Sequence, residues 1–423
     1  MIPPALDVPT PDWPVVGDQV PIAVLFTVHI AIAEFSLGVI TLAPILEAWG
    51  AGSGGERAAR LARQLARAYY LLFSLGATLG VFAVTALIGL WGNQIGTLVN
   101  RFLPLIGVAF GTFLVLTPLL ILYENSFGRM PGRRHVSLGV AVAALQTLFM
   151  VCIVAIDAHL INPGPAGLLG GARNPVYWGL LLHRLVGNVS WAALFVAAYA
   201  VLRLRRATDE GERAYRAWSA GVLLRIGTAT LVLMPVLGFV IMLTLRGSAR
   251  GFLDNLVRGD AAWLFVIQSA LLGVLFVGAN LALALETRRQ RARMDTTGRL
   301  AIAVATGGAV VGLLPAQVLT ESIYGLRYAG LLAAVLATLA HLVVRTLPRR
   351  PASAPAPAPG AEAALPFAGP SARAAVGVVG VVAAVLSLYM GFMKEQARGP
   401  YAIYGEMTQH DAHGVYNPGN TYP

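Results

Sequence analysis

Long apolar runs recur along the chain, and they constrain its fold more than any other feature. About 20 apolar residues are enough for an α-helix to cross the hydrocarbon core of a bilayer. Ten segments meet this length criterion, namely residues 20–48, 68–92, 103–124, 136–157, 178–203, 217–245, 261–286, 299–319, 327–346 and 373–393. The sequence therefore predicts an all-α fold, a polytopic membrane helix bundle of about ten transmembrane helices.

The composition excludes a soluble globular protein. Of the 423 residues, 57% are hydrophobic and 12% are charged, and the mean hydropathy is +0.69, whereas soluble chains carry about 25% charged residues. A net charge of +11 would suggest a nucleic-acid partner in a soluble protein. Here the arginines stand in short blocks between apolar runs, so we expect a lipid bilayer as the partner and no nucleic acid. The single cysteine, Cys152, leaves no disulfide, and no C-x-x-C-H sequence is present for a c-type haem.

The arginine blocks also indicate the orientation. They follow the first, third, fifth, seventh and ninth runs, while the other loops hold few arginines, apart from a loop of mixed sign after the sixth run. Because cytoplasmic loops are enriched in Lys and Arg, these blocks lie inside and both termini lie outside. A Pro/Ala-rich stretch separates the last run from the others. The expected parts are an external N-terminal segment, a nine-helix membrane domain, a cytoplasmic linker, an extra transmembrane helix and an external C-terminal tail, over residues 1–19, 20–346, 347–372, 373–394 and 395–423.

Polar side chains gather near the outer surface that this topology defines. His29 lies about two turns into the first run, and Glu34 lies more than a turn deeper. His183 lies at a matched depth to His29 in the fifth run and is followed directly by Arg184. The other polar positions near this surface are His159, Gln268, Glu321, Glu395 and Arg398. Ionisable residues at membrane depth are rare and usually functional. Imidazoles on bundle helices commonly ligate haem iron and arginines commonly pair with its propionates, so these positions predict a cofactor site with Arg184 in the second role.

The alternative for any single polar position is an ordinary side chain at the membrane interface. We expect that reading for His341, near the cytoplasmic end of the ninth run, whereas His135 lies in a basic cytoplasmic loop where we expect it to be solvated.

Four stretches, taken in order, resemble one known family. A histidine followed by "SLGVITLAPILE" lies in the first run, and "LFSLGATLGVFAVTALIGLWGN" forms the second. "IDAHLINP" ends the fourth run, and "LLHRLVGNVSWAALFV" lies in the fifth. Over roughly residues 20–345 the chain resembles subunit I of cytochrome bd quinol oxidase.

The resemblance implies several expectations. His183 would ligate a low-spin haem b, and His29 would ligate a second haem, with haem iron as the metal and a quinone or quinol as a further ligand. A second membrane subunit is expected, because the family works as a heterodimer. The location would be the inner (cytoplasmic) membrane of a bacterium, with the haem sites near the periplasmic side.

The chain departs from the family's pattern in the third helix, the quinol loop and the low-spin haem site. The family's third helix carries two glutamates that serve the oxygen-reducing haem and its proton supply, whereas residues 103–124 here have only Glu124, at the cytoplasmic end. The quinol loop is reduced to "RGSARGFLDNLVRGD", and Gln268 stands where the family has the methionine that completes the low-spin haem. Without an internal carboxylate chain, no route for protons to bound oxygen is evident.

Two stretches partly match a further motif of the family. The motif is Glu-x-x-Arg with a following Pro-aromatic pair. "TESIYGLRY" at Glu321 lies in the expected run, while "KEQARGPYAIYGE" at Glu395 and Arg398 fits better but follows the extra helix. Both assignments stay open.

The C-terminal tail holds His410 and His413 in an H-x-x-H pattern. On a helix this spacing would place both imidazoles on one face and suit a metal, but the glycine, proline and asparagine that follow disfavour a helix. The alternative is an extended, aromatic-rich tail that packs on a partner.

Three functions remain open. The first is a haem b subunit of a respiratory complex, part of a quinol-linked oxidoreductase, that passes electrons between the quinone pool and an external redox protein such as a c-type cytochrome. It accounts for the outer histidines and the missing glutamates. The second is a bd-type terminal oxidase that reduces oxygen to water, for which those glutamates must be dispensable. The third is a haem-free structural or transport subunit, although no pair of broken helices indicates a substrate site. We favour the first.

Overall fold

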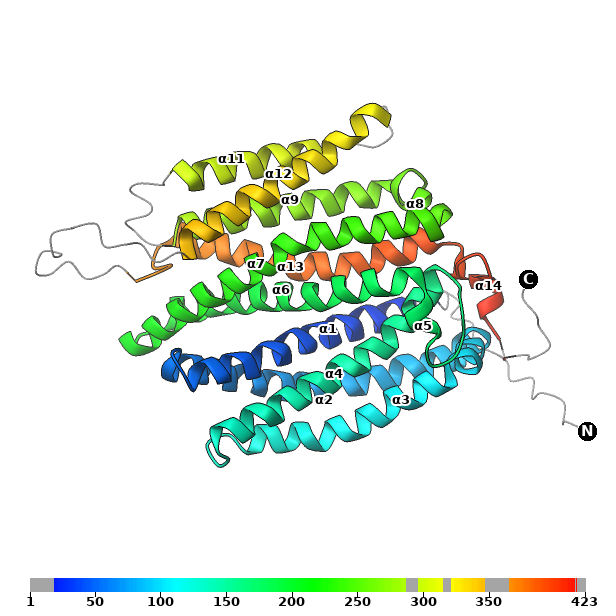
Figure 1. Ribbon diagram of the computed structural model, residues 1–423, viewed down its shortest axis with the longest axis horizontal. Helices are drawn as coiled ribbons and strands as arrows, with labels where there is room; N and C mark the ends of the chain where they lie inside the picture. Colours follow the sequence, from blue (N-terminus) through cyan, green and yellow to red (C-terminus); the bar gives the residue numbers. More distant parts are fainter. Residues whose placement is uncertain (1–18, 287–295, 315–320, 347–364, 415, 417–423) are drawn as a thin grey trace, which may run out of the picture. The chain divides into compact units, whose positions relative to one another are not determined.

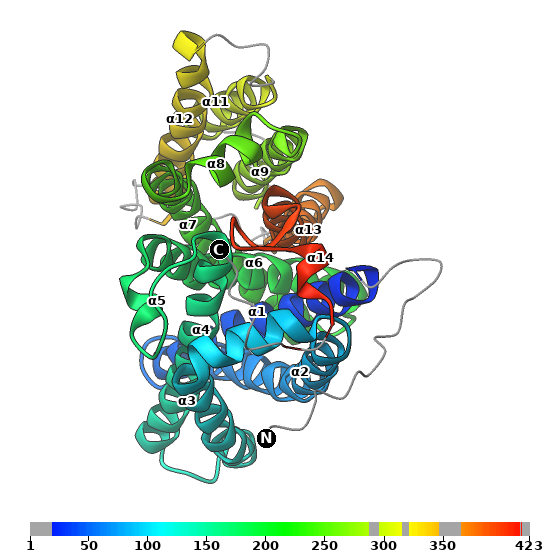
Figure 2. The same cartoon turned by 90° about the vertical axis from the view of Figure 1, so that its right-hand side faces the viewer.

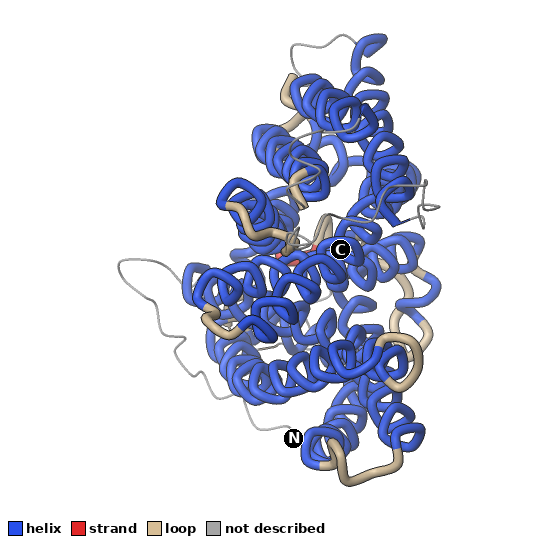
Figure 3. The backbone as a smooth tube through the Cα atoms, turned by 90° about the vertical axis from the view of Figure 1, so that its left-hand side faces the viewer, coloured by secondary structure: helices blue, strands red, loops and turns tan. Residues whose placement is uncertain are grey.

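The computed structural model describes residues 19–286, 296–314, 321–346, 365–414 and 416 (Figure 1). Nearly all of this is helical, as the blue tube in Figure 3 shows. Nine of the described helices are long and apolar enough to cross a membrane. These are α1 Gln19–Gly50, α2 Gly55–Leu90, α3 Gly92–Asn125, α4 Gly132–Ile161, α6 Pro175–Arg206, α7 Glu210–Ser248, α9 Ala262–Ala284, α12 Glu321–Thr346 and α13 Pro370–Arg398. The shorter elements are α5 Gly170–Arg173, α8 Arg250–Val257, α11 Thr296–Gly312, β1 Tyr401–Ile403, β2 Met407–Thr408 and α14 Gln409–Ala412.

The expected all-α polytopic membrane bundle is confirmed. Large apolar side chains such as Val81 and Phe110 are more than 60% exposed, which suits contact with lipid rather than water. The eighth expected run begins as α11 and then leaves the described residues. Helix α13 continues to Arg398, so the Glu-x-x-Arg motif lies on its last turn rather than in a tail. The expected domain bounds stay a prediction.

Contacts divide the chain into two compact units built from interleaved segments. The first unit comprises Met1–Leu185, Leu237–Ala261 and Gly391–Pro423. The second comprises Val186–Val236 and Ala262–Met390. Helices α6, α7 and α13 therefore contribute residues to both units.

In the first unit, α1 to α4 form a closed four-helix bundle. Helix α1 packs on α2 and α4, and α3 packs on the same two helices. Short turns between consecutive helices make the neighbours antiparallel. The turn after α1 depends on Gly50, because a Cβ there would lie 2.6 Å from the backbone nitrogen of Ala59.

Helix α3 is interrupted at Phe102, whose φ of −121° and ψ of 17° are not helical. Pro104 lies two residues later and has no N–H to give to the carbonyl one turn earlier, so the helix bends at this point. Beside the bend, the carbonyl of Arg101 accepts a hydrogen bond from the backbone N–H of Gly167 at 2.8 Å. The bend thereby ties α3 to the segment between α4 and α5.

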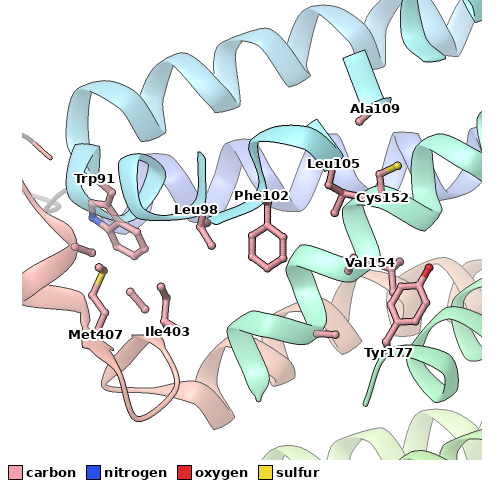
Figure 4. Packing of buried hydrophobic residues seen from close by; sticks show 14 of the residues in the cluster. Trp91, Leu98, Phe102, Leu105, Ala109, Cys152, Val154, Tyr177, Ile403 and Met407 are labelled. Carbon is pink, nitrogen blue, oxygen red and sulfur yellow. The ribbon is translucent and has the colours of Figure 1, made fainter. Parts of the chain in front are cut away.

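The C-terminal tail packs on α3 and α4 of its own chain (Figure 2). The amide of Gln94 donates to the carbonyl of Ala402 at 3.3 Å, and the amide of Asn93 donates to that of Asp411 at 2.6 Å. Ile403 and Met407 join the buried cluster that also holds Trp91, Phe102 and Tyr177 (Figure 4). The tail is thus part of the core of the first unit.

The H-x-x-H pattern in this tail does not lie on one helix face. Helix α14 contains His410, whose side chain is 99% exposed, and ends before His413. The ring centroids of His413 and Trp91 lie 6.1 Å apart. In the described residues, no three His, Cys, Asp or Glu side chains are grouped to bind a metal ion.

Two histidines are buried, although we expected His135 to be solvated and His341 to lie at the membrane interface. In the first unit, His135 approaches Glu47 with its Nδ1 at 2.5 Å and the carbonyl of Tyr123 with its Nε2 at 3.0 Å. In the second unit, Nδ1 of His341 lies 2.8 Å from Oδ1 of Asn280. These polar partners lie on other helices and compensate for the loss of water.

Candidate functional site

The imidazole of His183 has the most open setting of the expected cofactor residues. It lies two turns into α6, is half-buried, and forms no hydrogen bond with the described part of the chain. Gly238 of α7 faces it, and a Cβ at that glycine would lie 3.9 Å from Nε2. Buried polar groups normally have hydrogen-bond partners. A ring nitrogen without one, in front of a glycine, is available to a metal.

Arg184, the next residue, is already engaged by two carboxylates. Its Nε and Nη2 donate to Oε1 of Glu34 at 3.0 and 2.8 Å. Its Nη1 donates to Oδ2 of Asp157. We expected this guanidinium to pair with haem propionates. Three of its five N–H donors face carboxylates of α1 and α4, and the propionate role stays a prediction. Arginine favours this arrangement because its planar donors match carboxylates well.

Asp157 also binds a second cation. Nζ of Lys394 lies 3.2 Å from Oδ1 of Asp157 and 3.5 Å from Oε1 of Glu395. Glu34, Asp157, Arg184 and Lys394 thus form one network, the charge cluster, with side chains only 16–20% exposed. Its members come from α1, α4, α6 and α13, and all belong to the first unit.

Two members of this cluster were not singled out from the sequence. Asp157 stands inside a run otherwise rich in apolar residues, and Lys394 is the only lysine of the chain. These were the available signals. Their pairing could not be read from the sequence, because the two residues are 237 positions apart.

His29 is held by helix α2. Because a carbonyl only accepts hydrogen bonds, its contact of 3.0 Å with the carbonyl of Gly76 places the proton on Nδ1. The lone pair of His29 is then on Nε2, as in histidines that ligate metals through that atom. Gly80 makes room for the ring, since a Cβ there would lie only 2.8 Å from Cε1.

Both ring nitrogens of His159 lie next to hydrogen-bonding groups of the protein. Its Nε2 lies 3.2 Å from Nη1 of Arg101, and its Nδ1 accepts from the backbone N–H of Gly164 at 3.2 Å. The edge of the Phe102 ring packs against it at 5.1 Å between centroids. With both nitrogens facing donors of the protein, this buried ring offers no free lone pair to a cofactor.

Arg398 is 4% exposed and only partly satisfied. Its Nη2 donates to Glu395, while Nε and Nη1 have no partner among the described residues. A buried guanidinium with two open donors is costly unless an anion completes it. Glu395 is half-exposed and also contacts Lys394, so this motif adjoins the charge cluster.

Gln268 and Glu321 belong to the second unit. The amide oxygen of Gln268 is buried with no partner among the described residues. The side chain of Glu321 lies outside the described residues, although α12 begins there. Arg327 belongs to the same partial match of the motif and donates to the carbonyl of Gly312 at 2.8 Å. Its guanidinium carbon lies over the ring of Phe265, 5.0 Å from the ring centroid. Arg327 is therefore better satisfied than Arg398.

The one glutamate of the third helix is bound away from any cofactor position. Oε1 of Glu124 lies 3.1 Å from Nη1 of Arg67, near the turn between α3 and α4. From Gly92 to Tyr123, α3 contains no carboxylate. This helix supplies no acidic side chain at membrane depth.

The first unit fits a haem by the chemistry of its donors. His183 offers an open ring nitrogen, His29 offers a second one with its tautomer fixed, and Arg398 offers open donors to an acidic substituent. These are the groups that axial ligation and propionate binding require.

Comparison with known proteins agrees with this chemistry. The family model of cytochrome bd terminal oxidase subunit I matches residues 19–245. A search of curated proteins gave no match. Among solved structures, the fold is similar to that of bd oxidase from Geobacillus thermodenitrificans, with a TM-score of 0.52 and 16% sequence identity over 90% of this chain and 97% of that one. At this identity the likeness concerns the fold alone.

Proposed function

The chain belongs to the cytochrome bd terminal oxidase subunit I family, which makes it a respiratory membrane subunit, and we propose that it passes electrons between the quinone pool and a redox protein outside the membrane. Subunit I of this family binds haems and quinol. One observation carries the proposal: Nε2 of His183 has no hydrogen bond among the described residues and faces a glycine.

Each residue has a defined role in this proposal. His183 ligates iron through Nε2, and His29 offers Nε2 to a second haem while Gly76 holds its Nδ1 proton. Arg398 pairs with a propionate through Nε and Nη1, with Glu395 fixing the guanidinium. When bound, haem b supplies a one-electron carrier at membrane depth. Gln268 and Glu321 stay predictions for the cofactor site, and we assign no ligand role to His159.

Electron transfer is preferred to oxygen reduction because of the acidic side chains. Oxygen reduction to water consumes protons, which need a chain of titratable groups through the membrane. Helix α3 lacks carboxylates over Gly92–Tyr123, and the buried acids Glu34 and Asp157 are each bound by a cation. A conduit for electrons needs no such chain.

The same reasoning supports the proposed surroundings. A second membrane subunit completes the complex, and a periplasmic redox protein such as a c-type cytochrome exchanges electrons at the outer side. The location is the inner membrane of a bacterium, as the alternating arginine blocks and the family suggest.

A reduced-minus-oxidised spectrum of the purified protein, with and without carbon monoxide, tests the proposal. We expect a b-type band that carbon monoxide leaves unchanged, and its loss in His183→Ala but not in His410→Ala, whose imidazole is 99% exposed. A band that shifts with carbon monoxide would show an open iron and favour the terminal oxidase. Absence of haem from the wild-type protein would favour a structural or transport subunit.

A further inference from the structure

The charge cluster lies next to three of the four side chains to which we assign cofactor roles. Arg184 directly follows His183, and Lys394 directly precedes Glu395, the partner of Arg398. Consecutive Cα atoms are about 3.8 Å apart, so the backbone of each of these two charged residues adjoins that of a residue with a cofactor role. Glu34 is on α1, just over one turn after His29.

Within the cluster, the charges are balanced and tightly paired. Two carboxylates, Glu34 and Asp157, face two cations, Arg184 and Lys394. Asp157 binds both cations, one through each carboxylate oxygen. The formal charges sum to zero, so the loss of any one member leaves a net charge of known sign.

Such a network in the membrane is costly and asks for an explanation. Charges withdrawn from water are stabilised only when their geometry is good, and apolar residues of similar size often serve stability equally well. In the second unit, the buried guanidinium of Arg327 donates to two neutral groups, the hydroxyl of Ser269 and the carbonyl of Gly312. Four charges from four helices beside His183 therefore suggest a role for the charge itself.

We propose that Glu34, Asp157, Arg184 and Lys394 act together as positioning residues that set the reduction potential of the haem held by His183. This inference rests on the proposed function. Reduction of the iron adds one negative charge, so a nearby anion disfavours it and a nearby cation favours it. In surroundings of low dielectric constant these effects are large and decay slowly with distance. Asp157 is the central member because it alone contacts both cations.

The proposal predicts shifts of opposite sign for acidic and basic members. Asp157→Asn and Glu34→Gln each leave the cluster with a net charge of +1, which raises the midpoint potential. Lys394→Met leaves it at −1, which lowers the potential. A purely mechanical clamp would not produce this reversal, because loosening the helices acts in the same way whichever charge is lost.

Glu124→Gln is the matched control within the same unit. Its carboxylate is also largely buried and paired with an arginine, Arg67. The ring of the adjacent Tyr123 packs near Gly139 of α4, and Asp157 lies 18 residues further along that helix, about 27 Å at 1.5 Å per residue. Removal of the charge of Glu124 should therefore leave the reduction potential of the haem unchanged.

The experiment is a potentiometric titration of the haem absorbance in the purified wild type and these variants. An upward shift in Asp157→Asn and Glu34→Gln, a downward shift in Lys394→Met and none in Glu124→Gln support the proposal. The neutral pair Asp157→Asn with Lys394→Met should return towards the wild-type potential, and it provides the test if a single variant loses its haem. Equal potentials throughout, or shifts of one sign, would overturn it. A wild type without haem would instead refute the proposed function.

Discussion

The packing of His29 against α2 gives a sharp prediction for Gly80→Ala. The added Cβ would lie 2.8 Å from Cε1 of His29, whereas ordinary contacts begin at 3.4 Å, so the ring must move by about 0.6 Å. The hydrogen bond from Nδ1 to the carbonyl of Gly76 measures 3.0 Å. A displacement of that size lengthens it to at most about 3.6 Å, beyond the usual range.

The energetic cost follows from these distances. Loss of the hydrogen bond costs roughly 0.5–1.5 kcal/mol, and forcing a methyl group into a packed interface costs roughly 1–3 kcal/mol. The gain in helix propensity from glycine to alanine returns at most about 1 kcal/mol. Gly80→Ala should therefore destabilise the protein by about 1–3 kcal/mol and weaken binding of haem at His29.

Gly89→Ala is the control on the same helix, because no atom lies within 4 Å of the Cβ it would add. The assay is thermal unfolding in detergent followed by tryptophan fluorescence, together with the absorbance spectrum of the haem. We expect a lower melting temperature and an altered spectrum only for Gly80→Ala. If both variants match the wild type in both measurements, the ring of His29 is not held as described.

Three further changes test other parts of the structure. Gly238→Leu should lose most of its haem in a pyridine haemochrome assay, because a branched side chain would start 3.9 Å from Nε2 of His183, where a metal–imidazole bond of about 2 Å must form. Gly247→Leu on the same helix is the control and should retain its haem, because no atom lies within 4 Å of the Cβ it would add. Tyr69→Phe should lower stability by roughly 1–3 kcal/mol in the same unfolding assay, because it leaves a buried glutamine oxygen without its hydrogen bond of 2.7 Å. Hydrogen bonds from the side chain and backbone of Thr408 hold the pKa of Asp411 below its ordinary value of about 3.9. The stability that these bonds add is complete above that ordinary value and is lost as the pH falls through the lowered pKa, so hydrogen exchange of residues 401–414 should accelerate in that acidic range, and Asp411→Asn should remove this dependence.

The sequence was sufficient to predict the helices because the bilayer sets their length and character. Apolar runs of about 20 residues can satisfy their backbone groups only as helices, and the long helices follow these runs. The helix ends were less predictable. Helix α7 has 39 residues, and α13 reaches Arg398, because helices continue beyond the lipid where local packing supports them.

The setting of the candidate site was less accessible from sequence, because it depends on partners from distant segments. Arg184 next to His183 suggested a propionate ligand, but nothing local indicated that Glu34 and Asp157 would bind it. His159 met the same expectations as His183 until Arg101 and Gly164 were placed beside it. Residue type and depth predict which groups are functional candidates, whereas hydrogen-bond partners decide which of them remain open.

The docking of the tail on α3 has a consequence for the order of assembly. The hydrogen bonds of Asn93 and Gln94 join residues that are 318 and 308 positions apart. Helices α1 to α4 can therefore gather while most of the chain is still being translated, but one end of their bundle must wait for residues 401–412. A chain that stops short of them would lose the hydrogen bonds from Asn93 to Asp411 and from Gln94 to Ala402, and would uncover apolar surface at Trp91. This end of the bundle is therefore closed only in chains that include residues 401–412, and a truncated chain exposes it to proteases and to other proteins.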